Sequence, residues 1–283
     1  MFPITALLPE PPRIKIVDIG AMSLGEGKEP YARLLKNVPC QIIGFEPIAR
    51  ECERLNLSAR PGCTYLPHAV GDGTERNFYE CEFAATSSLL EPNHELLAMF
   101  HDLPAVTRVA AVSRLRTVRL DDVPQAAGTD YLKLDVQGGE LMVLQNATTI
   151  LRDVLVLHTE VEFSPIYRDQ PLFADIDAFL RGQGMVLHKI SGTKGATFKL
   201  PGVEVELTGV TNQMMWGEAV YIRDFMKLGE LSPQALLKLA VILHENYEAY
   251  DLVGVVLDAH DRKAGTDLAD RYVACVFASP GEA

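Results

Sequence analysis

The chain has 283 residues with 26 basic and 38 acidic side chains, and its formal net charge of −12 argues against nucleic acid as a partner. Hydrophobic residues make up 48% of the chain, which excludes wholesale disorder, and no apolar run reaches the roughly 18 residues of a membrane span. The first residues lack the features of a signal peptide, and five cysteines without a CxxC pair favour reduced thiols, so we expect a cytoplasmic protein.

Short, β-branched apolar runs alternate with helical patterns along most of the chain. The runs that predict strands are 14–19, 40–45, 64–70, 131–136, 154–161, 185–190 and 219–223. Helical periodicity follows two of them, over 141–151 and 172–180. Nearly continuous apolar strands separated by helices are typical of a parallel sheet covered on both faces. We therefore expect an α/β fold.

Two segments depart from this alternation. Between about residues 77 and 128 the rhythm breaks, and an insertion of this length in a sheet is more often functional than idle. After Asp224 the pattern is helical, with Ser232 and Pro233 as the predicted cap and first turn. We expect a main domain over residues 1–224 and a helical C-terminal appendage over residues 225–283. The apolar stripe of the appendage would form core or the surface of a homodimer.

Two predicted strand ends carry the pattern of a nucleotide-binding site. The first strand ends in Asp18, Ile19 and Gly20, where a glycine lets the backbone approach a ligand. The turn is not GxGxxG, so a dinucleotide pyrophosphate site is poorly supported. The second strand ends at Glu46, where nucleotide-binding sheets hold two ribose hydroxyls through a carboxylate. Either feature alone is ordinary, but together they favour a ribose-containing cofactor.

The next two strands add polar groups at the same edge of the sheet. The strand 131–136 places Asp135 at its carboxyl end, where open α/β sheets bind their ligands. Glu140, a few residues on, is either part of the site or a first-turn acid that suits the helix dipole. The strand 154–161 directs His158, Glu160 and Glu162 to one face. That stripe is either a catalytic or metal-binding cluster or a solvated edge.

Taken together, several segments resemble the FkbM family of S-adenosylmethionine-dependent methyltransferases. They are VDIGA, GFEP, AVGDG, LKLDVQGGELMVLQNA, TEVEFSPIYRDQPLFADIDAFL and MWGEAV, spread over residues 14–224. The resemblance implies a Rossmann-like class I methyltransferase fold. Its seven-stranded, mostly parallel sheet would have the order 3-2-1-4-5-7-6, an antiparallel last strand and helices on both faces. Where the family pattern is closer to DVGANxG and DVEGxE, this chain has Met22-Ser23-Leu24 and Gln137-Gly138-Gly139.

The resemblance also implies roles for individual residues. The residues implied to bind the cofactor are Asp18, Ile19, Gly20, Ala21, Glu46, Pro47, Ala69, Val70, Asp135 and Val136. Glu46 would bind the ribose, Ala69 and Val70 would flank the adenine, and Asp135 would face the reactive end. Ser87, Ser88 and Gln137 are the candidates for binding the substrate, and Asp135, His158 and Glu160 are the candidate catalytic bases.

We expect an enzyme that transfers the methyl group of S-adenosylmethionine to a hydroxyl of a small molecule or sugar and releases S-adenosylhomocysteine. A nearby base would remove the hydroxyl proton. A divalent metal held by Asp135 and Glu160 is the rival arrangement, less favoured because the sequence has no dense ligand cluster. An NAD-dependent oxidoreductase and a non-catalytic Rossmann-like binding module are the alternative functions.

Overall fold

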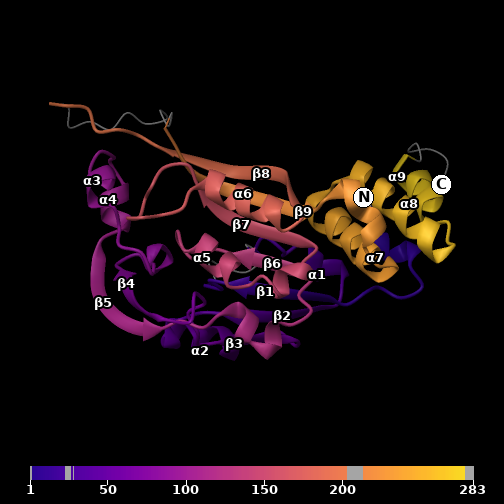
Figure 1. Cartoon of the computed structure of the whole chain (residues 1–283), viewed down its shortest axis with the longest axis horizontal. Coiled ribbons are helices and arrows are strands. Elements are labelled where there is room, and N and C mark those ends of the chain that lie inside the picture. Colours follow the sequence, from indigo (N-terminus) through magenta and orange to yellow (C-terminus); the bar gives the residue numbers. More distant parts are fainter. Residues whose placement is uncertain (1, 23–26, 28, 203–212, 278–283) are drawn as a thin grey trace.

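Figure 1 shows a computed structural model of the chain, which describes residues 2–22, 27, 29–202 and 213–277. The strands of the main sheet are β1 (Ile14–Ile19), β2 (Cys40–Phe45), β3 (Cys63–Leu66), β6 (Tyr131–Leu134), β7 (Val156–Glu162), β8 (Met185–Ala196) and β9 (Gln213–Arg223). Their order is β3-β2-β1-β6-β7-β9-β8. Only the pairs that include β9 are antiparallel.

The sheet order confirms the predicted fold class. Two further strands, β4 (Glu75–Cys81) and β5 (Val109–Arg116), pair with each other in a separate antiparallel sheet. The strand labels therefore differ from the predicted numbers, but the strands of the main sheet, counted alone along the chain, follow the order 3-2-1-4-5-7-6. The run that ends in Asp135 is central, since β6 lies between β1 and β7.

Some predicted elements have the wrong length. The third strand ends at Leu66 and not at Val70, because Pro67 cannot donate a ladder hydrogen bond and fixes its own φ. Ala69 and Val70 lie in the loop that follows, where Val70 forms an isolated bridge with Val118. At the other edge, β8 and β9 run further than predicted, to the pair Ala196 and Gln213, as a two-stranded arm (Figure 1).

The helix predicted over 141–151 is also too long. It is divided into α5 (Glu140–Gln145) and a short 3-10 turn (Ile150–Arg152). The carboxylate of Asp121, in the insertion, accepts hydrogen bonds from the backbone N–H groups of Thr149 and Ile150, and these bonds begin the second turn separately. The following helix, α6 (Phe173–Gly182), forms where it was predicted.

Both faces of the sheet are covered, and β1 contributes to both. Ile14 and Ile16 pack in one cluster with α1 (Leu34–Asn37), α7 (Pro233–Ile242), α8 (Tyr250–Ala264) and α9 (Leu268–Phe277). Val17 and Ile19 pack in another cluster with α5 and α6. The strands are thus nearly continuous apolar runs because they are buried on two sides.

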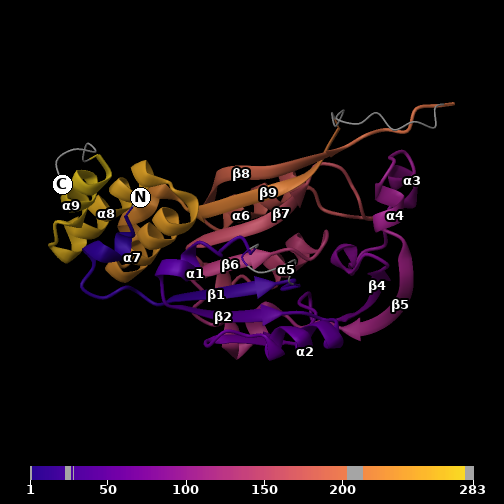
Figure 2. The same cartoon turned by 180° about the vertical axis from the view of Figure 1, so that it is seen from behind.

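The C-terminal helices and the insertion lie at opposite ends of the sheet. Figure 2 shows α7, α8 and α9 beside the amino end of β1, whereas β4 and β5 lie beyond its carboxyl end. The insertion also contains α3 (His94–Leu97) and α4 (Leu103–Val106), and α2 (Ala49–Leu57) follows β2. Because the C-terminal helices share a core with the sheet, the boundary at Asp224 stays a prediction. Within the described residues, no helix combines the length and the apolar character that crossing a membrane requires.

Candidate active site

A pocket of about 720 Å³, counted with its opening to solvent, lies at the carboxyl ends of β1, β2 and β6. It is also lined by the loop after β3 and by the insertion. The predicted site residues that line it are Ile19, Gly20, Glu46, Pro47, Ala69, Val70, Ser87, Ser88, Asp135, Val136 and Gln137. The fold thus brings together, around one cavity, most of the residues implied by the family resemblance.

Gly20 joins two walls of this pocket. Its φ is +76°, and a β-carbon built on it would stand 1.9 Å from the backbone oxygen of Asp135. The backbone N–H groups of Gly20 and Ala21 both donate to the carbonyl of Phe45. A side chain at position 20 would therefore push β1 away from β6, and only glycine permits this turn.

Glu46 lies at the end of β2 and is only 2% exposed. Its Oε1 accepts a hydrogen bond from the backbone N–H of Ile48 at 2.8 Å. Burial raises the pKa of Glu46 to about 7, against the opposing effect of the Ile48 bond. No hydrogen bond within the described part of the chain involves Oε2, so this oxygen is available to a hydroxyl donor in the pocket.

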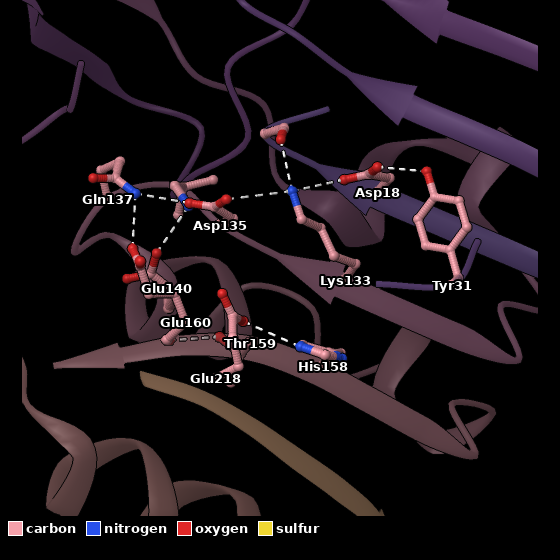
Figure 3. Close-up of polar contacts among 12 residues, drawn as sticks. Asp18, Tyr31, Lys133, Asp135, Gln137, Glu140, His158, Thr159, Glu160 and Glu218 are labelled. Atoms are coloured by element: carbon pink, nitrogen blue, oxygen red, sulfur yellow. Dashed lines mark hydrogen bonds and ion pairs between the residues drawn. The ribbon is translucent and has the colours of Figure 1, made fainter. Parts of the chain in front are cut away.

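Lys133 is the centre of a buried charge network behind the pocket (Figure 3). Its ammonium donates to the carbonyl of Gly20 at 2.7 Å and lies 3.1 Å from Asp18 Oδ1 and 3.7 Å from Asp135 Oδ2. The hydroxyl of Tyr31 donates to the other oxygen of Asp18 at 2.7 Å. Neighbouring Asp18 and Asp135 hold the pKa of Lys133 above its usual value despite its burial.

Asp18, which the resemblance implied to bind the cofactor, is instead part of this buried network. The Asp18 carboxylate is engaged by Lys133 and Tyr31, and neither Asp18 nor Ala21 lines the pocket. Neither Lys133 nor Tyr31 was predicted from the sequence to be a site residue. A lysine inside the otherwise apolar run Tyr131-Leu132-Lys133-Leu134 was the available signal, because a buried lysine needs a partner.

Asp135 is the carboxylate at the reactive edge implied by the resemblance, and its side chain is 35% exposed. The side-chain amide of Gln137 donates to Asp135 Oδ1 at 2.8 Å and to Glu160 Oε2 at 2.7 Å. Burial and nearby Asp135 raise the pKa of Glu160 well above its usual value. Glu160 therefore adjoins Asp135 through Gln137, although it does not line the pocket.

His158 shares a sheet face with Glu160 but lies further from the pocket. Its Nδ1 is 3.0 Å from the hydroxyl of Tyr247 and its Nε2 is 3.1 Å from Glu218 Oε2. The Tyr247 hydroxyl is in turn 2.8 Å from that of Tyr131. Both ring nitrogens of His158 are thus engaged, and one of them contacts the C-terminal helical segment. Sequence spacing placed His158, Glu160 and Glu162 on one face of this strand but could not give their distances from the cavity.

Glu140 supports the turn after β6. It begins α5 and is 1% exposed, and its Oε1 accepts a hydrogen bond from the backbone N–H of Val136 at 2.8 Å. Burial raises its pKa to about 7. It is therefore more than a solvated first-turn acid. Among the described residues, no three His, Cys, Asp or Glu side chains are arranged to hold a metal ion.

The two serines of the insertion differ in their availability. Ser88 is buried, and its hydroxyl donates to the carbonyl of Gln137 and accepts from the N–H of Leu90. The Ser87 oxygen accepts from the N–H of Cys81, which leaves its hydroxyl hydrogen for a ligand. Of the segment Met22-Ser23-Leu24, which departs from the family pattern, Ser23 and Leu24 lie outside the described residues.

The strand order and the pocket define a class I methyltransferase fold. The model of the methyltransferase FkbM domain matches residues 18–187, and the chain belongs to this family of S-adenosylmethionine-dependent methyltransferases. No protein with a curated description matches the chain.

Solved structures with a similar outline are distant in sequence. A magnesium protoporphyrin IX methyltransferase from Synechocystis PCC 6803 is 11% identical, with 75% of this chain and 71% of that chain covered and a TM-score of 0.39. An S-adenosylmethionine-dependent methyltransferase from Mesorhizobium loti is 12% identical, with 78% and 95% covered and a TM-score of 0.38. A 16S rRNA (adenine(1408)-N(1))-methyltransferase from Catenulisporales acidiphilia is 12% identical, with 78% and 90% covered and a TM-score of 0.36.

Proposed function

We propose that this methyltransferase transfers a methyl group to a hydroxyl oxygen of a small molecule or sugar, with Asp135 as the base. The observation that supports this proposal is the partly exposed Asp135 carboxylate in the pocket wall, next to Gly20 and close to Lys133. A carboxylate there is suited to accept the hydroxyl proton as the oxygen attacks. The net charge of −12 favours a small acceptor over a nucleic acid.

The pocket has the groups that S-adenosylmethionine requires. Glu46 offers a carboxylate oxygen to the ribose hydroxyls, and a charge-assisted bond of this kind is about twice as strong as a neutral one. Ala69 and Val70 offer an apolar wall to the adenine. Gly20 lines the pocket at the end of β1, where its backbone would face the methionine part of the cofactor. When bound, S-adenosylmethionine supplies the methyl group and leaves as S-adenosylhomocysteine.

The residues of this chain then have separate tasks. Pocket walls that hold donor and acceptor in line supply much of the rate enhancement, because they replace a bimolecular encounter. Lys133 and Gln137 fix the carboxylate of Asp135 from its two sides. Glu160 and His158 remain the alternative bases, but we rank Asp135 first since it lines the pocket and they do not.

Thermal unfolding with S-adenosylhomocysteine, with NAD and without ligand tests the cofactor assignment. We expect only S-adenosylhomocysteine to raise the melting temperature, as a ligand of the folded state does. Stabilisation by NAD alone would indicate an oxidoreductase, and stabilisation by neither would indicate a binding module. Mass spectrometry of a panel of hydroxylated metabolites, searched for products heavier by one CH2, then identifies the acceptor. Products that carry the methyl group only on nitrogen or carbon would contradict O-methylation.

A further inference from the structure

Gln137 has a strained backbone at the edge of the pocket. Its φ is +57°, and among the described residues only Asp169 and Glu248 share a positive φ without being glycine. Such a conformation disfavours a side chain and is stable only when the surroundings impose it. Here the hydroxyl of Ser88 donates to the carbonyl of Gln137 at 2.7 Å and helps to hold the turn. An observed outlier at a pocket edge suggests that its side chain has a task there.

The polar atoms of the Gln137 side chain are all engaged. Its Nε2 donates to Asp135 Oδ1 at 2.8 Å and to Glu160 Oε2 at 2.7 Å, and these bonds use both hydrogens (Figure 3). Its Oε1 lies 3.0 Å from the hydroxyl of Tyr167, whose single hydrogen is shared with the carbonyl of Thr86 at 2.9 Å. The two carboxylate acceptors require the amide nitrogen on their side, and the Tyr167 hydroxyl accordingly faces the amide oxygen. A substrate could gain a bond from this amide only by displacing one of them.

The surroundings of the Asp135 and Glu160 carboxylates are strongly acidic. Three further carboxyl groups lie nearby, on Glu140 of α5, Glu162 of β7 and Glu218 of β9. Glu218 is the residue directly opposite Glu160 in the register of β7 and β9. The ammonium of Lys133 reaches Asp135 but makes no contact with Glu160 within the described part of the chain. Two carboxylates in such a place repel each other unless a donor or a cation lies between them.

We propose that Gln137 is a positioning residue whose side-chain amide holds Asp135 and Glu160 together, in the place where a divalent cation would otherwise bridge two carboxylates. Carboxylate oxygens are the ligands that magnesium and manganese prefer, so a neutral amide between them favours chemistry without a metal. The proposal rests on the proposed function of Asp135 for its effect on turnover, but not for its geometry.

The geometry is tested without any acceptor. Gln137→Glu keeps the length of the side chain and substitutes a third carboxylate for the amide donor. We expect manganese ions to raise the melting temperature of Gln137→Glu and to bind it in a one-to-one ratio by electron paramagnetic resonance. The wild type, in which the amide lies between the two carboxylates, should show neither effect. Manganese bound between the carboxylates of the wild type, or a Gln137→Glu protein that binds none, would overturn the proposal.

The effect on turnover is tested with Gln137→Met, which has a similar length at the same backbone strain. We expect kcat to fall by up to about 100-fold, because a small misplacement of the Asp135 carboxylate can cost that much. The KM for S-adenosylmethionine should stay within about threefold, since Gln137 makes no bond to the ribose-binding Glu46. Tyr167→Phe, which keeps both carboxylate bonds, is the matched control and should lose less than Gln137→Met.

The two proposals fail in different ways. A folded Gln137→Met protein with unchanged kcat would overturn the role of Gln137 while leaving O-methylation intact. A wild type that methylates no hydroxyl would overturn the proposed function, and the manganese experiment would still decide whether the amide occupies the cation position.

Discussion

The ammonium of Lys133 donates a 2.7 Å hydrogen bond to the carbonyl of Gly20, so one buried cation joins β6 to the turn that follows β1. The same ammonium lies between the carboxylates of Asp18 and Asp135. Removing a single partner from a buried ion pair leaves an uncompensated charge, which costs more than the pair contributes.

We therefore expect Lys133→Met to lower the free energy of unfolding by about 3–5 kcal/mol. Urea denaturation measures the difference, with exposed Lys36→Met as the control. Adding Asp18→Asn to Lys133→Met should recover part of the loss, because the orphaned carboxylate becomes neutral. If Lys133→Met is as stable as Lys36→Met, the ion pairs of Lys133 do not contribute to the free energy of unfolding.

Glu46→Ala should weaken the binding of S-adenosylmethionine by about 1.5–3 kcal/mol, the range for hydrogen bonds to a charged group. Titration calorimetry on the folded variant measures the effect. Glu53→Ala, on the exposed side of α2, is the control and should bind as the wild type does. Unchanged affinity in Glu46→Ala would show that this carboxylate does not hold the ribose.

Cofactor affinity should also depend on pH through Glu46, whose pKa in the free protein is about 7. Bonds from the ribose hydroxyls favour the charged carboxylate, so affinity is full above this pKa and falls as the pH drops below it. We expect the dissociation constant to rise up to about tenfold from pH 8 to pH 6. Glu46→Gln, measured alongside, removes this component while titration of the ligand itself remains. Parallel pH profiles for the two proteins would contradict the assignment.

Asp135→Asn should cut turnover by roughly 10²–10⁴-fold, the usual contribution of a positioned base. Steady-state rates with the identified acceptor measure this, and Asp153→Asn, on an exposed turn, serves as the control. EDTA should leave the wild-type rate unchanged. If EDTA abolishes turnover and magnesium restores it, a metal-dependent mechanism replaces ours, and full turnover in Asp135→Asn would exclude both.

Glu140 should make the protein less stable at high pH. Its pKa is raised to about 7 in the folded state, so the stability it contributes is complete below its unfolded value near 4.5 and is lost as the pH rises through 7. Glu140→Gln removes that loss and keeps an oxygen for the N–H of Val136. The free energy of unfolding of Glu140→Gln, relative to wild type, should thus increase from pH 5 to pH 8. A pH-independent difference would mean that Glu140 is already ionised at low pH.

Strand positions could be predicted from the sequence, because strands buried on both faces leave continuous apolar runs that Gly20 and Glu46 terminate. The sheet order came from the family resemblance, since apolar runs alone give no order. The lengths of the strands and helices were less predictable. The outer part of β8 is held mainly by pairing with β9 and most of its side chains are exposed or half-buried, so they carry no apolar pattern. The helix after β6 was overestimated because Asp121, distant in the chain, divides it.

The pocket residues at strand ends were predictable for the same reason, since a parallel sheet brings its carboxyl ends to one edge. What each carboxylate contacts was not. Asp18 turns toward Lys133 and Tyr31, and His158 toward Tyr247, through contacts between segments that the spacing of residues does not encode. Sequence spacing gives the face of a strand but not the partner that lies over it.

The contact between the two ends of the chain constrains the order in which the protein can fold during synthesis. Ile4 packs among the C-terminal helices, its N–H donates to Glu245, and the carbonyl of Phe2 lies 2.9 Å from a ring nitrogen of His244. A ribosome makes β1, β2, β3, β6 and β7 well before α7 and α8. One apolar face of a nearly complete sheet thus waits in water for its cover, and the nascent chain is exposed to aggregation or to chaperones until its last helices emerge.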